Sequence, residues 1–308
     1  MTGLQGLAGG LFLVLAVLSW VPSAGLEASP ARLPLTLTGL LLVAGGGAGS
    51  IFHMHHKSAA RFVTRRLKTS WLSREVVTTM PFGVLAALSV ALPVLVPGST
   101  GALRWVLTAT ALMALVAMFV TAMIYATIPA MLSWHTPLTV LAMMGTGLVG
   151  GGVWAWAGLV VLTGRAETPL GIVLLVALGG LSVVKALQWA RFRRFRAHIH
   201  AARDMGTPGV RYRLHDTGTS RPPYRTQPQV WPPLPAERRR AMMTALLGTG
   251  ALTLLLLAVS GSAPVAGFAA VTAVFGVYVE RWLFFADATH SSLAWIADGF
   301  ALGGAGGA

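Results

Sequence analysis

Apolar residues fall into eight long blocks that polar or charged stretches separate. The blocks cover residues 3–22, 34–54, 76–96, 103–127, 137–162, 169–190, 241–260 and 264–286. Each block is about as long as the roughly 20 residues that an α-helix needs to cross a hydrocarbon core of about 30 Å. The blocks are continuously apolar rather than alternating, which favours helices over a β-barrel. The pattern therefore predicts an all-α integral membrane protein, a bundle of eight transmembrane helices.

Composition agrees with this class. Of the 308 residues, 55% are hydrophobic and 10% are charged, whereas about a quarter of the residues of a soluble domain are charged. We therefore expect residues 1–308 to form a single polytopic membrane domain. The first block could be mistaken for a signal peptide, but no Lys or Arg precedes Arg32, so we expect it to remain as a first helix.

The formal net charge of +14 is concentrated in two connections. Eighteen of the 23 basic residues lie between the second and third blocks or between the sixth and seventh. Both connections follow an even-numbered helix, so they share one face with the two termini. The positive-inside rule would place this face in the cytoplasm. A docking surface for a soluble partner or for anionic lipid fits the same charge, and nucleic-acid binding does not.

The second of these connections, residues 191–240, is a long basic, Pro-rich loop. Its first part, ARFRRFRAHIHAARDMG, predicts that the sixth helix continues beyond the membrane and stops at Gly206. The rest is typical of an extended, proline-stiffened loop.

Metal and haem chemistry receive little support from the sequence. The chain has no cysteine, which excludes disulfides and thiolate-ligated iron–sulfur clusters within it. Haem is disfavoured because no histidine lies in the middle of a block. The HMHH motif at residues 53–56 lacks an accompanying cluster of carboxylates or cysteines, so we predict no metal site.

Ionisable residues within membrane blocks are costly and are candidates for function. Lys185 lies about one turn before the end of its block and could extend its ammonium to the interface. Glu280 and Arg281 are adjacent on one helix, so their side chains point about 100° apart. We expect them not to pair with each other and each to need a partner elsewhere.

The stretch SIFHMHHKSAARFVTRRLKTSWLSREV carries the strongest candidate site. His53 closes the second block, and Glu75 opens the third beyond a basic run. A structural interpretation is that Ser73 caps the third helix and that its dipole favours Glu75, with Trp71 and Arg74 at the lipid interface. The functional alternative is oxidation of a lipid quinol, which needs proton acceptors beside water and an electron acceptor in a partner.

The segment HMHHKSAARFVTRRLKTSWLSREV resembles the membrane anchor subunit of the dimethyl sulfoxide reductase family. SWLSREV is the most specific part, and MIYATIPAMLSWHTPLT, KALQWARFRRF and VERWLFFADATH add to the resemblance. It implies an eight-helix anchor, not catalytic alone, in a bacterial cytoplasmic (inner) membrane. Such an anchor oxidises menaquinol and passes electrons through a ferredoxin-like iron–sulfur subunit to a molybdopterin catalytic subunit. The quinol-site residues carry over to His53 and Glu75.

Supporting positions near that site or within the membrane are Lys57, Ser73, Arg74, Lys185, Glu280 and Arg281. The sequence departs from the family at Met54–Lys57, which replace a Leu-Gly-x-Pro turn, and in the long loop, where HDTG at 215–218 keeps a trace of a family motif. The family places its partner-binding face outside, against the charge rule, so sidedness stays open.

Two other functions fit parts of the pattern. A polysulfide-reductase type of quinone-reactive anchor would play the same role. A transporter would need helices broken at mid-membrane, and the glycine runs at 44–50 and 149–152 could supply such breaks. Close helix–helix contacts explain these glycines more simply.

Overall fold

The computed structural model describes residues 2–53, 65–129, 131–165, 168–201, 236–259 and 262–288. Within these ranges, eight helices are long and apolar enough to cross a membrane. They are α1 (Thr2–Ser19), α2 (Arg32–His53), α3 (Trp71–Leu95), α4 (Thr100–Ala126), α5 (Pro137–Thr163), α6 (Thr168–Ala201), α8 (Ala236–Val259) and α9 (Ala263–Ala286). Each of the eight predicted helices is present, and the all-α membrane fold is confirmed.

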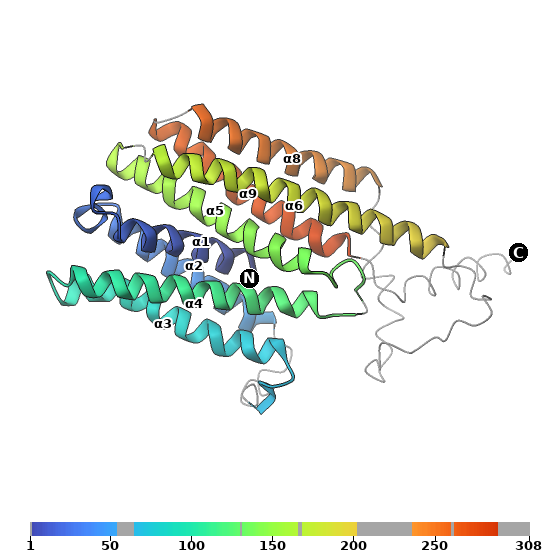
Figure 1. Cartoon of the computed structure of the whole chain (residues 1–308), viewed down its shortest axis with the longest axis horizontal. Helices are drawn as coiled ribbons and strands as arrows, with labels where there is room; N and C mark the ends of the chain where they lie inside the picture. The colour runs from blue at the N-terminus through green and yellow to red at the C-terminus, as the bar shows by residue number, and fades with distance from the viewer. Residues whose placement is uncertain are drawn as a thin grey trace, which may run out of the picture.

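The helices lie side by side in two groups (Figure 1). In the first group, α1 contacts α2 and α4, and α3 contacts α2 and α4. In the second group, α5 contacts α6 and α9, and α8 contacts α6 and α9. The two groups meet mainly where α1 and α4 pack against α5.

Glycines allow α1 and α5 to touch backbone to backbone. A Cβ on Gly151 would lie 2.0 Å from the carbonyl oxygen of Leu7, and a Cβ on Gly6 would lie 2.9 Å from the Cα of Gly147. No side chain fits in such a contact, so small residues set the distance between the two groups. The close-contact explanation is therefore confirmed for the run at 149–152.

The structure removes the broken-helix interpretation of this run, because α5 continues unbroken through it. The run at 44–50 behaves differently. A Cβ on Gly47 would meet nothing within 4 Å, and one on Gly45 would be in ordinary contact with Leu4. Close packing therefore does not explain these two α2 glycines.

The start of α3 differs from the predicted boundary, because the helix begins at Trp71 rather than at residue 76. Ser70 is the N-cap, and its hydroxyl accepts a hydrogen bond from the Ser73 backbone N–H at 3.3 Å. This capping contact stabilises a helical turn that is too polar for hydrophobicity to reveal. The expected cap at Ser73 is wrong, because Ser73 lies within the helix and is buried.

Beyond the predicted block, α6 continues to Ala201, as the basic continuation of the sixth helix indicated. The expected stop at Gly206 and the Pro-rich remainder of the loop lie outside the described residues.

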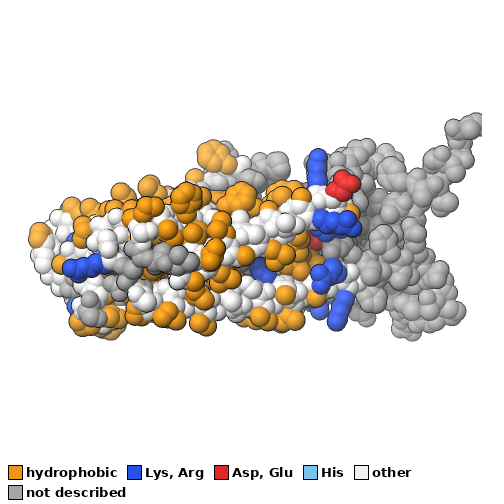
Figure 2. Space-filling model, turned by 90° about the horizontal axis from the view of Figure 1, so that it is seen from above, with side chains coloured by type: hydrophobic (Ala, Val, Ile, Leu, Met, Phe, Trp, Pro, Cys, Tyr) orange, Lys and Arg blue, Asp and Glu red, His pale blue; other side chains and the backbone are white. Residues whose placement is uncertain are grey.

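Basic side chains gather at one end of the helices. In Figure 2, Lys and Arg form a band at this end, and apolar side chains cover the long surface beside it. The exposed members of this basic end are Arg65, Arg66, Lys68, Arg193, Arg194, Arg238 and Arg240. The helices alternate in direction, so the end of α2 and the start of α3 both lie at the basic end. His53 and Glu75, the predicted quinol-site residues, belong to these two helix ends.

Candidate functional site

The turn before α3 is held against the helix by Arg74. Its Nε donates to the Leu67 carbonyl at 2.7 Å, and its Nη2 donates to the Lys68 carbonyl at 2.8 Å. The guanidinium also lies 4.1 Å from the centre of the Trp71 ring, a cation–π contact. Arg74 was expected at the lipid interface. Its observed contacts instead hold the turn before α3 in place.

Glu75 is buried just inside this entrance, with 4% of its surface exposed. It is the fifth residue of α3, and no acidic residue lies in the first turn of that helix. The helix dipole acts mainly on the first turn, so the dipole does not account for this carboxylate.

The observed partner of Glu75 is a hydroxyl group. Thr121 Oγ1 on α4 donates to Glu75 Oε1 at 2.7 Å, and both residues are buried. Within the part of the chain that the structure describes, Glu75 makes no ion pair. A buried carboxyl group with a neutral hydrogen-bond partner is suited to taking up and releasing a proton, because a hydroxyl stabilises the charged form less than an ion-paired cation would.

His53 is the last residue of α2. Its side chain, together with Lys57 and the rest of residues 54–64, lies outside the described part of the structure. Since α2 packs against α3 and ends where α3 begins, the backbone places His53 and Glu75 at the same end of neighbouring helices. The proposed pairing of these side chains stays a prediction.

A small cavity lies beside the Glu75–Thr121 pair. Its volume is about 10 Å³, and Gln5, Thr121 and Arg281 contribute to its lining. Gln5 Oε1 and Arg281 Nε are buried and have no hydrogen-bond partner among the described residues. A cavity of roughly this volume can hold one water molecule, and a water here would satisfy these groups.

Gln5 was not among the residues predicted from the sequence. It is a buried polar residue in an otherwise apolar helix, and its Nε2 donates to Thr79 Oγ1 on α3 at 3.1 Å. The rule that polar residues inside a membrane are candidates for function could have found it. Thr121 gave no such signal, because threonine in a transmembrane helix commonly bonds to its own backbone.

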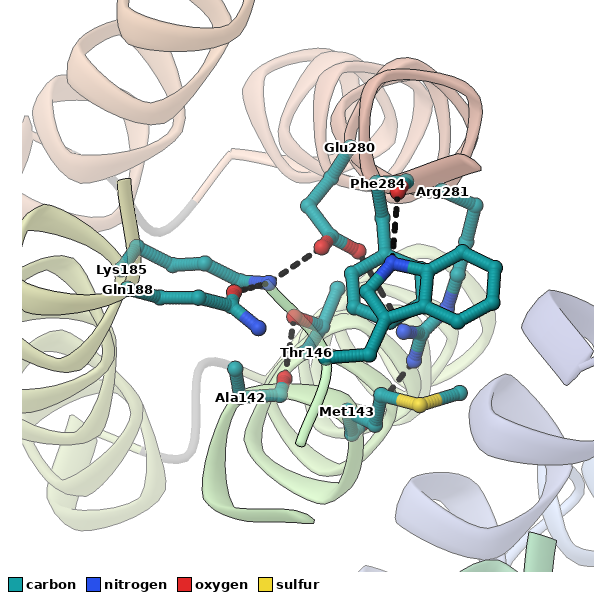
Figure 3. A network of polar contacts seen from close by, with 9 residues as sticks. Ala142, Met143, Thr146, Lys185, Gln188, Glu280, Arg281 and Phe284 are labelled. Atoms are coloured by element: carbon teal, nitrogen blue, oxygen red, sulfur yellow. Dashed lines mark hydrogen bonds and ion pairs between the residues drawn. The ribbon is translucent and has the colours of Figure 1, made fainter. Parts of the chain in front are cut away.

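A second buried network joins α6, α5 and α9 (Figure 3). Lys185 Nζ on α6 forms an ion pair with Glu280 Oε1 on α9 and lies 3.0 Å from Gln188 Oε1. Lys185 therefore turns into the bundle, and the suggestion that it extends to the interface is wrong. Pairing with a buried carboxylate stabilises the ammonium where water cannot.

Arg281 completes this network. Its Nη2 donates to the Met143 carbonyl on α5 at 2.7 Å, and its Nη1 lies 3.5 Å from Glu280 Oε2. The prediction that Glu280 and Arg281 do not pair is thus wrong. Although their Cβ atoms diverge, the long arginine side chain reaches back to its neighbour, and Figure 3 shows the guanidinium between Glu280 and Met143.

Metal ligation receives no support from the described residues, where no three His, Cys, Asp or Glu side chains are grouped to hold an ion. The side chains of the HMHH motif lie outside these residues. At the basic end, Asp287 pairs with Arg239 Nε at 2.8 Å and so joins the end of α9 to the start of α8.

Comparisons with known proteins agree with this architecture. The sequence model of the DMSO reductase anchor subunit (DmsC) family matches residues 2–204. A sulfite dehydrogenase subunit of Allochromatium vinosum is 30% identical over 279 residues, which cover 82% of this chain and 81% of that protein. No solved structure matches the chain. With its eight membrane-spanning helices and a family match over about two thirds of its length, the chain belongs to the DMSO reductase anchor subunit family.

Proposed function

We propose that this membrane anchor exchanges electrons between a lipid quinol, menaquinol, and a partner iron–sulfur subunit, with Glu75 as a proton acceptor. Oxidation of a quinol to a quinone breaks two O–H bonds and releases two protons and two electrons. Glu75 takes one proton and His53 the other, and both pass to water at the basic end. The electrons leave to the partner, because the chain has no cysteine to hold a cluster of its own.

The observation that carries this proposal is the setting of Glu75. Glu75 is buried about one turn inside a membrane helix, and its partner is a threonine hydroxyl rather than a cation. Burying a carboxylate in this way costs free energy, and ionisable residues inside the membrane commonly perform a function. Its position at the basic end supports a location near headgroup level, where a quinol ring and water can both reach.

The basic end supports the docking of soluble subunits. Its exposed arginines and lysines attract an acidic surface over a range of about 10 Å at moderate salt. We propose that a ferredoxin-like iron–sulfur subunit binds here and carries electrons to a molybdopterin catalytic subunit. The complex would lie in a bacterial cytoplasmic membrane, and co-purification with the full chain tests the association.

The test is quinol turnover in variants of the intact complex. Glu75→Gln keeps the shape but cannot accept a proton, and we expect menaquinol-driven turnover to fall about 100-fold or more. His53→Ala should have a similar effect. Electron donation from a reduced viologen dye bypasses the anchor, so dye-driven turnover and assembly should be unchanged. Full menaquinol turnover in both variants would refute the assignment.

Electron flow in the opposite direction is the second candidate. The relative from Allochromatium vinosum is named as a sulfite dehydrogenase subunit, which suggests that the complex of this chain also feeds electrons into the membrane. Glu75 would then donate a proton to the quinone that is being reduced. Sulfite-dependent reduction of menaquinone by the purified complex, faster than reduction of sulfate or another oxidised substrate by menaquinol, would select this direction.

A further inference from the structure

A large chamber lies among α5, α6, α8 and α9, apart from Glu75. Its volume is about 480 Å³, within the range of about 300–1,000 Å³ that small-molecule sites occupy. Most of its lining is apolar or small. Lys185, Trp189 and Glu280 contribute polar groups, and the exposed Arg193 also lines the chamber. Neither the quinol chemistry at Glu75 nor the docking of partners uses this chamber.

The chamber opens toward lipid between α6 and α8. Ser182 and Ala186 on α6 line it and are exposed, as are Leu247 and Ala251 on α8. A molecule dissolved in the membrane can therefore enter from the side without passing through water.

The chamber offers a neutral donor. Lys185 and Glu280 are already paired, so their charges compensate each other. The Trp189 Nε1–H group is buried and has no acceptor among the residues that the structure describes. A buried N–H group without an acceptor costs free energy, so the chamber favours a ligand that brings neutral oxygen acceptors.

We propose that this chamber is a second binding site and that its occupant is a lipid-soluble quinone. A ring carbonyl accepts a hydrogen bond from the Trp189 indole, and the isoprenoid tail lies along the apolar lining toward the opening. A phospholipid can place its phosphate against Arg193, an exposed residue of the lining, but its acyl chain brings no acceptor for the buried Trp189 N–H. The proposal concerns binding alone and does not depend on redox chemistry at Glu75.

Gly250 offers a way to fill the chamber. It lines the chamber, and a Cβ built on it meets nothing within 4 Å, so Gly250→Leu should fold and occupy the ligand's space. Gly248 also has free space at its Cβ but is exposed and does not line the chamber. Gly248→Leu is therefore a matched control on the same helix.

The experiment measures equilibrium binding of radiolabelled menaquinone-4 to the purified full chain in phosphatidylcholine nanodiscs. We expect Gly250→Leu to bind one equivalent fewer than the unmodified chain, and Gly248→Leu to bind the same number. Trp189→Phe keeps the volume but removes the N–H, and should weaken the chamber's affinity about three- to tenfold, as for a neutral hydrogen bond. Glu75→Gln should leave this equivalent in place, which separates the chamber from the proposed site at Glu75.

Two results would overturn the proposal. One is equal menaquinone stoichiometry in the Gly250→Leu and Gly248→Leu proteins. The other is loss of a tightly bound phospholipid, rather than menaquinone, from the Gly250→Leu protein, which would assign the chamber to a lipid chain.

Discussion

The two buried glutamates show how environment separates function from stability. Glu280 lies between Lys185 and Arg281 and forms ion pairs with both. Glu75 accepts a hydrogen bond from the Thr121 hydroxyl and, in the described ranges, has no cation beside it. An ion-paired carboxylate resists protonation, whereas one with a neutral partner can exchange a proton. Glu75 is therefore the glutamate that fits the proposed quinol chemistry, and Glu280 joins α9 to α6.

The contact between Thr121 and Glu75 leads to a first prediction. Thr121→Val removes the hydroxyl that orients the carboxylate, and a hydrogen bond to a charged group is worth roughly 1.5–3 kcal/mol. We expect menaquinol-driven turnover to fall about tenfold, less than in Glu75→Gln. Thr110→Val on the same helix is the control, because Thr110 bonds to the Val106 carbonyl instead. Equal losses in the two variants would contradict the positioning role.

A second prediction concerns the ion pair between Lys185 and Glu280. Removing one partner leaves a buried charge without its counter-ion, at a cost of about 3–5 kcal/mol. Lys185→Met and Glu280→Gln should each lower the midpoint of thermal unfolding in detergent, and the double variant should recover part of the loss. A double variant whose loss equals the sum of the two single losses would show that the pair is not coupled.

These residue-scale contacts lie largely beyond prediction from sequence. His53 and Glu75 were selected through the family resemblance and their spacing around one loop. Thr121 joins the site from 46 positions away, and only the packing of α4 on α3 brings it there. The expectation that Glu280 and Arg281 do not pair rested on the directions of their Cβ atoms. It neglected the length of the arginine side chain, which reaches Glu280.

At the scale of elements, α1 and α5 form the central contact of the bundle. The closest approach is at Gly151, where a Cβ would lie 2.0 Å from the Leu7 carbonyl oxygen and 2.7 Å from the Leu11 backbone nitrogen. Backbone atoms cannot turn aside as a flexible side chain can, so any larger residue forces the helices apart.

A third prediction follows for this crossing. Gly151→Ala should destabilise the protein by about 1–3 kcal/mol or more, as overpacking does, and should lower the yield of monodisperse protein. Gly179→Ala on α6 is a suitable control, because a Cβ there meets nothing within 4 Å. Equal thermal midpoints for the two variants would show that the crossing tolerates a methyl group.

The elements were the most predictable part of the molecule. Hydrophobic length alone located all eight helices, because the bilayer sets both the length and the apolar character of each span. Boundaries in polar sequence were less predictable. The first turn of α3, WLSR, depends on the Ser70 cap and on Arg74 folding back to the preceding turn, and hydrophobicity does not reveal these contacts.

At the scale of the whole molecule, charge is separated from the apolar surface, and the basic end of the bundle is the expected docking face.

A fourth prediction is that Arg238→Glu combined with Arg240→Glu weakens association with the iron–sulfur subunit about tenfold at low salt, and less at high salt, where charges are screened. Arg165→Glu is the control, because Arg165 is exposed just after α5, at the other end of the bundle. Equal weakening by both changes would exclude docking at the basic end.

The most direct measurement is the rate at which menaquinol reduces the iron–sulfur clusters of the intact complex in a single turnover. The visible absorbance of the clusters reports their reduction, without contribution from the terminal reaction. We predict that Glu75→Gln slows this step about 100-fold or more, while Thr110→Val keeps the unmodified rate. Cluster reduction by menaquinol at the unmodified rate in the Glu75→Gln complex would contradict a proton-accepting role for Glu75.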